Sequence, residues 1–72
     1  MTDVTSYRIE IKGPFDEADL NAMSPLRMTV MRSALESTLV TACTDQAGVL
    51  GLLRYLNGRG ITFFSVQRQS TS

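Results

Sequence analysis

The chain has 72 residues, of which 43% are hydrophobic and 19% charged, and its seven basic and seven acidic side chains cancel at neutral pH. These values are ordinary for a globular protein and exclude a disordered, fibrous or collagen-like chain. A net charge of zero provides no long-range field to attract nucleic acid or an anionic membrane surface. We therefore expect a single domain over residues 1–72, ordered over about residues 6–69, that binds neither nucleic acid nor membrane.

The sequence contains no histidine and a single cysteine, Cys43. Without histidine, the chain lacks the commonest general base and the commonest metal ligand. Cys43 follows an apolar run, which favours a small buried side chain over a reactive thiol. We predict that the protein is not an enzyme and that it carries no cofactor and no metal. The lack of a signal peptide or of a run of about 20 apolar residues favours a cytoplasmic location.

The first half of the chain begins with a strand. Apolar and charged residues alternate over residues 7–12, as in a strand with one buried and one exposed face. Gly13 and Pro14 end this strand, because proline cannot donate to a sheet. Acidic residues then open a short helix, predicted over residues 16–23, which must end before Pro25.

Two strands joined by a hairpin follow. Alternating apolar residues predict a strand over residues 26–30, and a turn is expected over residues 34–37. Residues 38–44 are rich in small and β-branched side chains, which suits a central strand.

The second helix is the strongest helical signal in the sequence. Thr44 or Asp45 is expected to cap its N-terminus, and the glycines of residues 57–60 are expected to end it. One stripe of apolar residues is predicted to pack against the sheet: Val49, Leu50, Leu53 and Leu56.

A final strand is predicted over residues 61–69. Strict alternation would place Ile61, Phe63 and Ser65 on one face and Thr62, Phe64 and Val66 on the other. The order β-α-β-β-α-β predicts an α+β fold of the ferredoxin-like type, a two-layer sandwich in which a four-stranded antiparallel sheet carries two helices on one face.

The segment from Asp45 to Leu53, with Gly60-Ile61 and Ser65-Val66, resembles the closing half of a group of short uncharacterised bacterial proteins. The similarity extends over about residues 7–68, although Gly48 stands where that group usually has alanine. The resemblance implies a ferredoxin-like βαββαβ fold and implies no activity.

Residues 44–66 also resemble ACT domains, in which Asp-x-x-Gly-(Val/Leu)-Leu marks a loop that receives an amino-acid effector. In this sequence the motif lies in the second βαβ half, and Ala47 replaces the proline often found before its glycine. The ACT-like resemblance implies a possible small-molecule effector loop made of Asp45, Gln46, Gly48, Val49 and Leu50.

Our favoured hypothesis is a small, non-enzymatic interaction or regulatory module that forms a homodimer or docks on another protein. A short chain buries little surface, so pairing of two open sheet faces would add to a small core. The residues expected at such an interface are Phe63, Phe64, Val40 and Met31. The alternative hypothesis is an ACT-like domain that binds an amino-acid effector.

Overall fold

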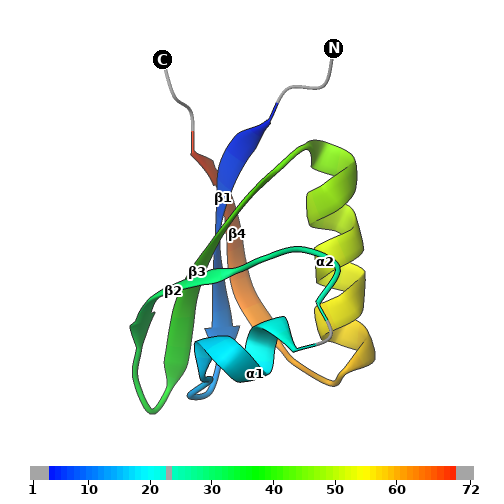
Figure 1. Ribbon diagram of the computed structural model, residues 1–72. Helices are drawn as coiled ribbons and strands as arrows, with labels where there is room; N and C mark the ends of the chain where they lie inside the picture. The colour runs from blue at the N-terminus through cyan, green and yellow to red at the C-terminus, as the bar shows by residue number, and fades with distance from the viewer. Residues whose placement is uncertain (1–3, 23, 70–72) are drawn as a thin grey trace.

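The structure is a computed structural model, and it describes residues 4–22 and 24–69. It is an α+β fold in which a four-stranded open sheet has the strand order β2-β3-β1-β4, with all neighbours antiparallel (Figure 1). The elements are β1 (Thr5–Lys12), α1 (Glu17–Asn21), β2 (Thr29–Ser33), β3 (Ser37–Thr44), α2 (Gln46–Gly58) and β4 (Phe63–Gln69). The expected α+β class, with an antiparallel sheet and two helices, is therefore confirmed.

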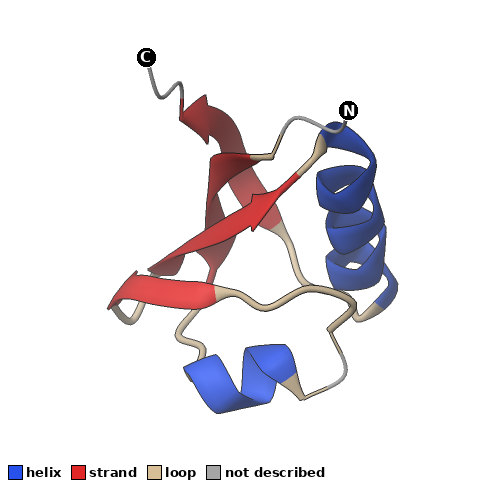
Figure 2. Ribbon diagram, turned by 45° about the horizontal axis from the view of Figure 1, so that its top comes forward, coloured by secondary structure: helices blue, strands red, loops and turns tan. Residues whose placement is uncertain are grey.

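Strand β1 lies between β3 and β4 and forms the centre of the core. The predicted alternation is confirmed, because Tyr7, Ile9 and Ile11 are buried while Arg8 and Lys12 are exposed. Helix α2 runs along the buried face of the sheet (Figure 1), whereas the short α1 lies across one end of the molecule (Figure 2). The core is therefore a single layer between α2 and one face of the sheet.

The buried stripe of α2 differs from the predicted one. Val49, Leu52 and Leu56 are buried, whereas Leu50 is 51% exposed and Leu53 is partly buried. The three buried residues are spaced by three and then four positions, which follows the 3.6-residue turn of an α-helix. Leu50 was wrongly placed in the stripe because an apolar residue next to Val49 lies about 100° away around the helix axis.

Helix α2 ends in a Schellman motif, as its closing glycines indicate. The N–H of Ile61 donates to the carbonyl oxygen of Leu56 at 3.0 Å, and the N–H of Gly60 donates to that of Asn57 at 3.0 Å. Gly60 has a φ of +77°, in the left-handed region that glycine adopts at little cost. Ile61 belongs to this motif and packs against the core, so β4 begins at Phe63 and not at residue 61 as predicted.

Strand β2 begins three residues later than the predicted start at Leu26, because a side chain binds the chain before it. The amide group of Asn21 accepts from the N–H of Met28 at 2.7 Å and donates to its carbonyl oxygen at 2.8 Å. The Asn21 side chain thus bonds both backbone groups of Met28, as a neighbouring strand would, and Met28 is fully buried. Leu26 and Met28 therefore lie in a loop, while Thr29 starts the strand.

Helix α1 is shorter than the predicted 16–23 and ends at Asn21; Met23 lies outside the described residues. The loop before α1 is held by Thr38, whose hydroxyl is fully buried on β3. This hydroxyl donates to the carbonyl oxygen of Gly13 at 2.9 Å and accepts from the N–H of Phe15 at 3.0 Å. One buried side chain thus fixes the loop that connects β1 to α1.

A β-bulge interrupts the predicted alternation of β4. Ser65 lies opposite Glu10 and Phe63 lies opposite Ile11, which leaves Phe64 as the extra residue. Phe63 packs against the core, whereas Phe64 is 57% exposed. Val66 lies opposite the buried Ile9 and therefore shares a face with Phe63, although strict alternation placed these two residues on opposite faces. The bulge is the physical reason for this correction, because it shifts the register by one residue.

We predict opposite effects for two glycine-to-alanine substitutions. Gly60→Ala should lower the free energy of unfolding by about 1 kcal/mol, because a Cβ is strained at a positive φ. Gly51→Ala should raise it by about 0.5–1 kcal/mol, because a Cβ at this exposed helical position meets no atom within 4 Å. Urea unfolding of both variants tests the pair, and a stabilised Gly60→Ala would contradict the described helix end.

We also predict that Thr38→Val destabilises the protein by about 1–3 kcal/mol, because the shape is kept while the Gly13 carbonyl and the Phe15 N–H lose their buried partner. Thr41→Val on the same strand is the matched control, since the Thr41 hydroxyl forms no hydrogen bond among the described residues. Equal effects of the two substitutions in urea unfolding would show that Thr38 does not fix the loop.

Candidate functional site

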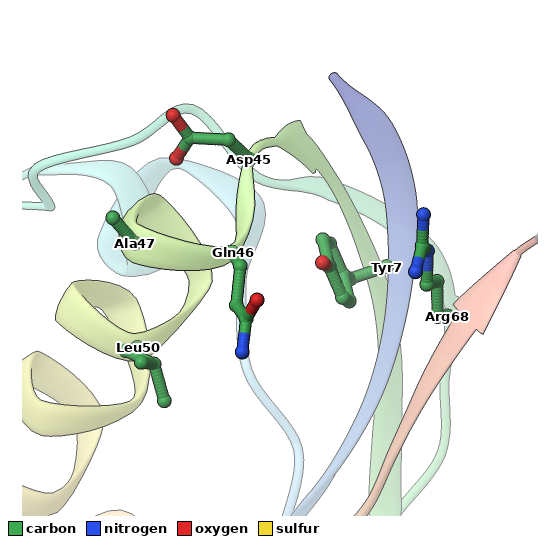
Figure 3. A pocket seen from close by; sticks show the side chains of 6 residues that line it. All are labelled: Tyr7, Asp45, Gln46, Ala47, Leu50 and Arg68. Atoms are coloured by element: carbon green, nitrogen blue, oxygen red, sulfur yellow. The ribbon is translucent and has the colours of Figure 1, made fainter. Parts of the chain in front are cut away.

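A cleft of about 600 Å³ lies between the first turn of α2 and the strands β1 and β4 (Figure 3). It is lined by Tyr7, Asp45, Gln46, Ala47, Leu50 and Arg68. Most of these side chains are exposed, so the cleft is open to solvent. Its volume lies in the range of about 300–1,000 Å³ that is typical of small-molecule sites.

The expected capping role of Asp45 is confirmed at the edge of this cleft. Its Oδ1 accepts from the N–H of Gly48 at 2.7 Å, and its carbonyl oxygen accepts from the N–H of Val49 at 3.1 Å. The first N–H groups of a helix have no partner within the helix. The N–H groups of Gln46 and Ala47 form no hydrogen bond among the described residues, and both residues line the cleft.

Gly48 is required by a close approach of α2 to β3. A Cβ built on Gly48 would lie 1.9 Å from Oγ1 of Thr44, and 3.2 Å from Oδ1 of Asp45. The first of these distances is far below any van der Waals contact, so a larger residue would displace Thr44 or the helix. This contact is the structural reason for a glycine at position 48.

Tyr7 and Arg68 contribute to the cleft from neighbouring strands. They lie directly opposite each other in the pairing of β1 with β4, so both side chains belong to the same face of the sheet. Tyr7 is 8% exposed, and its ring extends from β1 toward the first turn of α2 (Figure 3). Its hydroxyl has no hydrogen-bond partner among residues 4–22 and 24–69. In that part of the chain every fully buried side-chain nitrogen or oxygen has a partner, so the Tyr7 hydroxyl is not fully buried and opens into the cleft that Tyr7 lines.

Sequence reasoning missed both Tyr7 and Arg68 as cleft residues. Tyr7 fits the alternation of the first strand, and Arg68 stands in the last strand without a motif around it. No local pattern joins them, because their proximity depends on the register between the first strand and the last. The bulge at Phe64 sets that register.

The predicted effector loop is brought only in part to the cleft. Asp45, Gln46 and Leu50 line it, whereas Gly48 packs on Thr44 and Val49 is 4% exposed within the core. Three of the five predicted residues therefore share one surface. Leu50 lines the cleft because it lies about 100° around the helix axis from the buried Val49 and so points away from the core.

The residues predicted for a dimer interface do not form one patch. Val40 is fully buried opposite Ile9, so its assignment to an exposed surface is corrected. Phe63 packs against the core, while Phe64 and Met31 are each 57% exposed. Met31 lies on β2 and Phe64 on β4, which are the opposite edges of the sheet.

The face of the sheet opposite α2 is mainly polar. Its central positions alternate with the buried residues of β1 and β3, and the register brings charged and hydroxyl groups together. The side chains on this face include Arg8, Glu10, Thr41, Ser65 and Gln67. Cys43 is exposed and not buried as expected, because its neighbours in β3, Ala42 and Thr44, take the buried positions.

Within the described residues, no group of three or more cysteine, aspartate and glutamate side chains is placed to hold a metal ion. No helix in that part of the chain is long and apolar enough to cross a membrane.

We predict that Gly48→Ala destabilises the protein by about 1–3 kcal/mol through overpacking against Thr44. In a Thr44→Ala background the same substitution should cost clearly less, because the closest contact, with Oγ1, is removed. Unfolding of the two single variants and the double variant gives the interaction energy of this cycle. Additive costs would show that Gly48 and Thr44 do not constrain each other.

Comparison with known proteins identifies a family and no function. No curated protein and no solved structure matches the chain. A family model described as a domain of unknown function, DUF8691, matches residues 6–67 and thus covers all six helices and strands except the ends of β1 and β4. The chain therefore belongs to the DUF8691 family of domains of unknown function.

Proposed function

We propose that this protein is a small, non-enzymatic interaction module with a ferredoxin-like fold that associates with a second copy of itself. The strand order β2-β3-β1-β4, together with the element order β-α-β-β-α-β, supports the ferredoxin-like assignment. Helix α1 has only five residues, so of the two helices expected on one face of a ferredoxin-like sheet only α2 runs along the sheet.

The observation that carries self-association is the exposed edge of β4. This strand pairs with β1 on one side only, and its sequence from Phe63 to Gln67 contains neither proline nor a charged residue. Proteins usually protect an edge strand with such residues, because its free N–H and C=O groups can pair with another chain. Phe64 and Val66 add apolar surface at this edge, with 57% and 37% of their side chains exposed.

The other surfaces support association less well. The face opposite α2 carries Arg8, Glu10 and Lys12 along its central strand, so pairing two such faces would remove charged groups from water. Strand β2 is the second edge, but it is five residues long against seven for β4, so it offers fewer backbone groups to a second copy. The edge of β4 is therefore the surface that we assign to a second copy.

An ACT-like effector domain is the second candidate function. The observation that favours it is that Asp45, Gln46 and Leu50, three residues of the resemblance-based effector loop, line the cleft at the start of α2. On this proposal the protein responds to a small molecule, with or without a second copy.

We predict that the protein forms a dimer in solution and that Phe64→Ser converts it to a monomer. The substitution removes the largest apolar contact at the β4 edge without disturbing the core, because Phe64 is largely exposed. Light scattering across a dilution series measures the solution mass of the wild type and of the variant.

Met31→Ser is the matched control, because Met31 has the same 57% exposure and lies on the opposite edge. It should leave the mass unchanged. Dissociation by Met31→Ser alone would place the interface at β2, and a monomeric wild type at all concentrations would sink the self-association proposal.

A further inference from the structure

We propose that the cleft at the start of α2 is a binding site for a small aliphatic carboxylate. Arg68, the hydroxyl of Tyr7 and the first N–H groups of α2 would hold the carboxylate, and Leu50 would contact the aliphatic part. This inference is independent of self-association, and it deepens the effector-binding candidate by naming a ligand class and two residues outside the motif.

The first support is the unpaired hydroxyl of Tyr7. The side chain is 8% exposed and its hydroxyl has no partner among the described residues, although it opens into the cleft. A nearly buried phenol usually has a hydrogen-bond partner, since the group loses its contacts with water on burial. A carboxylate oxygen in the cleft would be a stronger acceptor for this hydroxyl than the water that the open cleft admits.

The second support is that the cleft gathers donors and positive charge. The N–H groups of Gln46 and Ala47 lie at the N-terminus of a helix of 13 residues, where the helix dipole favours an anion. Arg68 is placed beside Tyr7 by the pairing of β1 with β4. Arginine binds carboxylates through two parallel hydrogen bonds, which adds direction to the charge.

The carboxylate that already lines the cleft does not oppose this assignment. Oδ1 of Asp45 accepts from the N–H of Gly48 at 2.7 Å, so this oxygen is held at the helix cap. Figure 3 shows the Asp45 carboxylate turned away from Tyr7 and Arg68, on the far side of the first helical turn. Its negative charge therefore lies at the rim, while Tyr7 and Arg68 contribute to the cleft from the sheet.

The third support concerns the remainder of the ligand. Leu50 is 51% exposed one turn further along α2, where its side chain lines the same cleft, and Ala47 is exposed next to it. An aliphatic group would cover this apolar surface, which otherwise contacts water. The combination of donors at one end and Leu50 at the other is the reason for naming an aliphatic carboxylate rather than a free inorganic anion.

The test compares two compounds of the same shape, 4-methylpentanoate and its neutral amide 4-methylpentanamide. Each is titrated into the ¹⁵N-labelled full chain at a fixed protein concentration, and backbone amide shifts are followed by NMR. We expect the carboxylate to shift the N–H signals of Gln46 and Ala47 and to bind at least about tenfold more tightly than the amide, since an ionised acceptor forms the stronger bonds.

Tyr7→Phe and Arg68→Gln test the two assigned side chains. Each should weaken binding of 4-methylpentanoate by about tenfold, and Arg68→Gln should change the weak binding of the amide less, because the uncharged amide forms no ion pair with Arg68. Arg8→Gln is the matched control, because Arg8 is an exposed arginine on the opposite face of the sheet and should have no effect. The NMR fingerprint of each variant shows whether it is folded.

Three outcomes would overturn the inference. Equal binding of the acid and the amide would remove the carboxylate assignment, yet the effector-binding candidate would remain. Binding of L-leucine without binding of 4-methylpentanoate would show that an ammonium group is needed, which also favours an amino-acid effector over the class proposed here. Failure of all three compounds to shift the amides at the cleft would overturn the inference itself. The solution mass, measured on the same samples, reports on self-association separately.

Discussion

The structure depends on one close approach, between Gly48 at the start of α2 and Thr44 at the end of β3. Because a Cβ on Gly48 would lie 1.9 Å from Oγ1 of Thr44, the Thr44 side chain in its present position leaves no room for one. Asp45, between them, caps the helix and fixes where it begins. The position of α2 then decides which of its residues enter the core, and it also places the first N–H groups at the cleft. Packing and the candidate site therefore share one local constraint.

The opposite end of the core is closed in a different way. Helix α1 has five residues, too few to form an independent amphipathic helix, and it buries only Leu20. Polar side chains supply the missing order: Asn21 holds the backbone of Met28, and Thr38 holds the loop at Gly13. Each such hydrogen bond adds little to the net stability of the fold. Removing one partner is costly, because it leaves a buried polar group without a hydrogen bond. The protein thus combines one apolar layer with hydrogen-bonded loops. The loop hydrogen bonds add order that a short chain cannot obtain from apolar burial alone.

Local patterns predicted β1, β3, the hairpin between β2 and β3, and the cap of α2, because each depends on neighbouring residues alone. The errors occur where a distant contact decides the outcome. Strand β2 starts late because Asn21 binds Met28, and β4 departs from alternation because a bulge leaves Phe64 without an opposite residue. The cleft was found in part, through the motif around Asp45. Tyr7 and Arg68 were missed because only the register of β1 with β4 brings them together.

The two proposed surfaces are connected through β4. Arg68, at the cleft, lies two residues from Val66, which is exposed at the edge assigned to a second copy. A chain paired along this edge would restrict the backbone that carries Arg68, and so change the entropy lost when Arg68 binds a carboxylate. By thermodynamic reciprocity, a ligand whose affinity differs between monomer and dimer must shift the monomer–dimer equilibrium by the same factor. If both proposals hold, the protein has the parts of a ligand-controlled interaction module. The bulge at Phe64 is then the feature that sets both surfaces, since it fixes the register of β4 and exposes the phenylalanine at its edge.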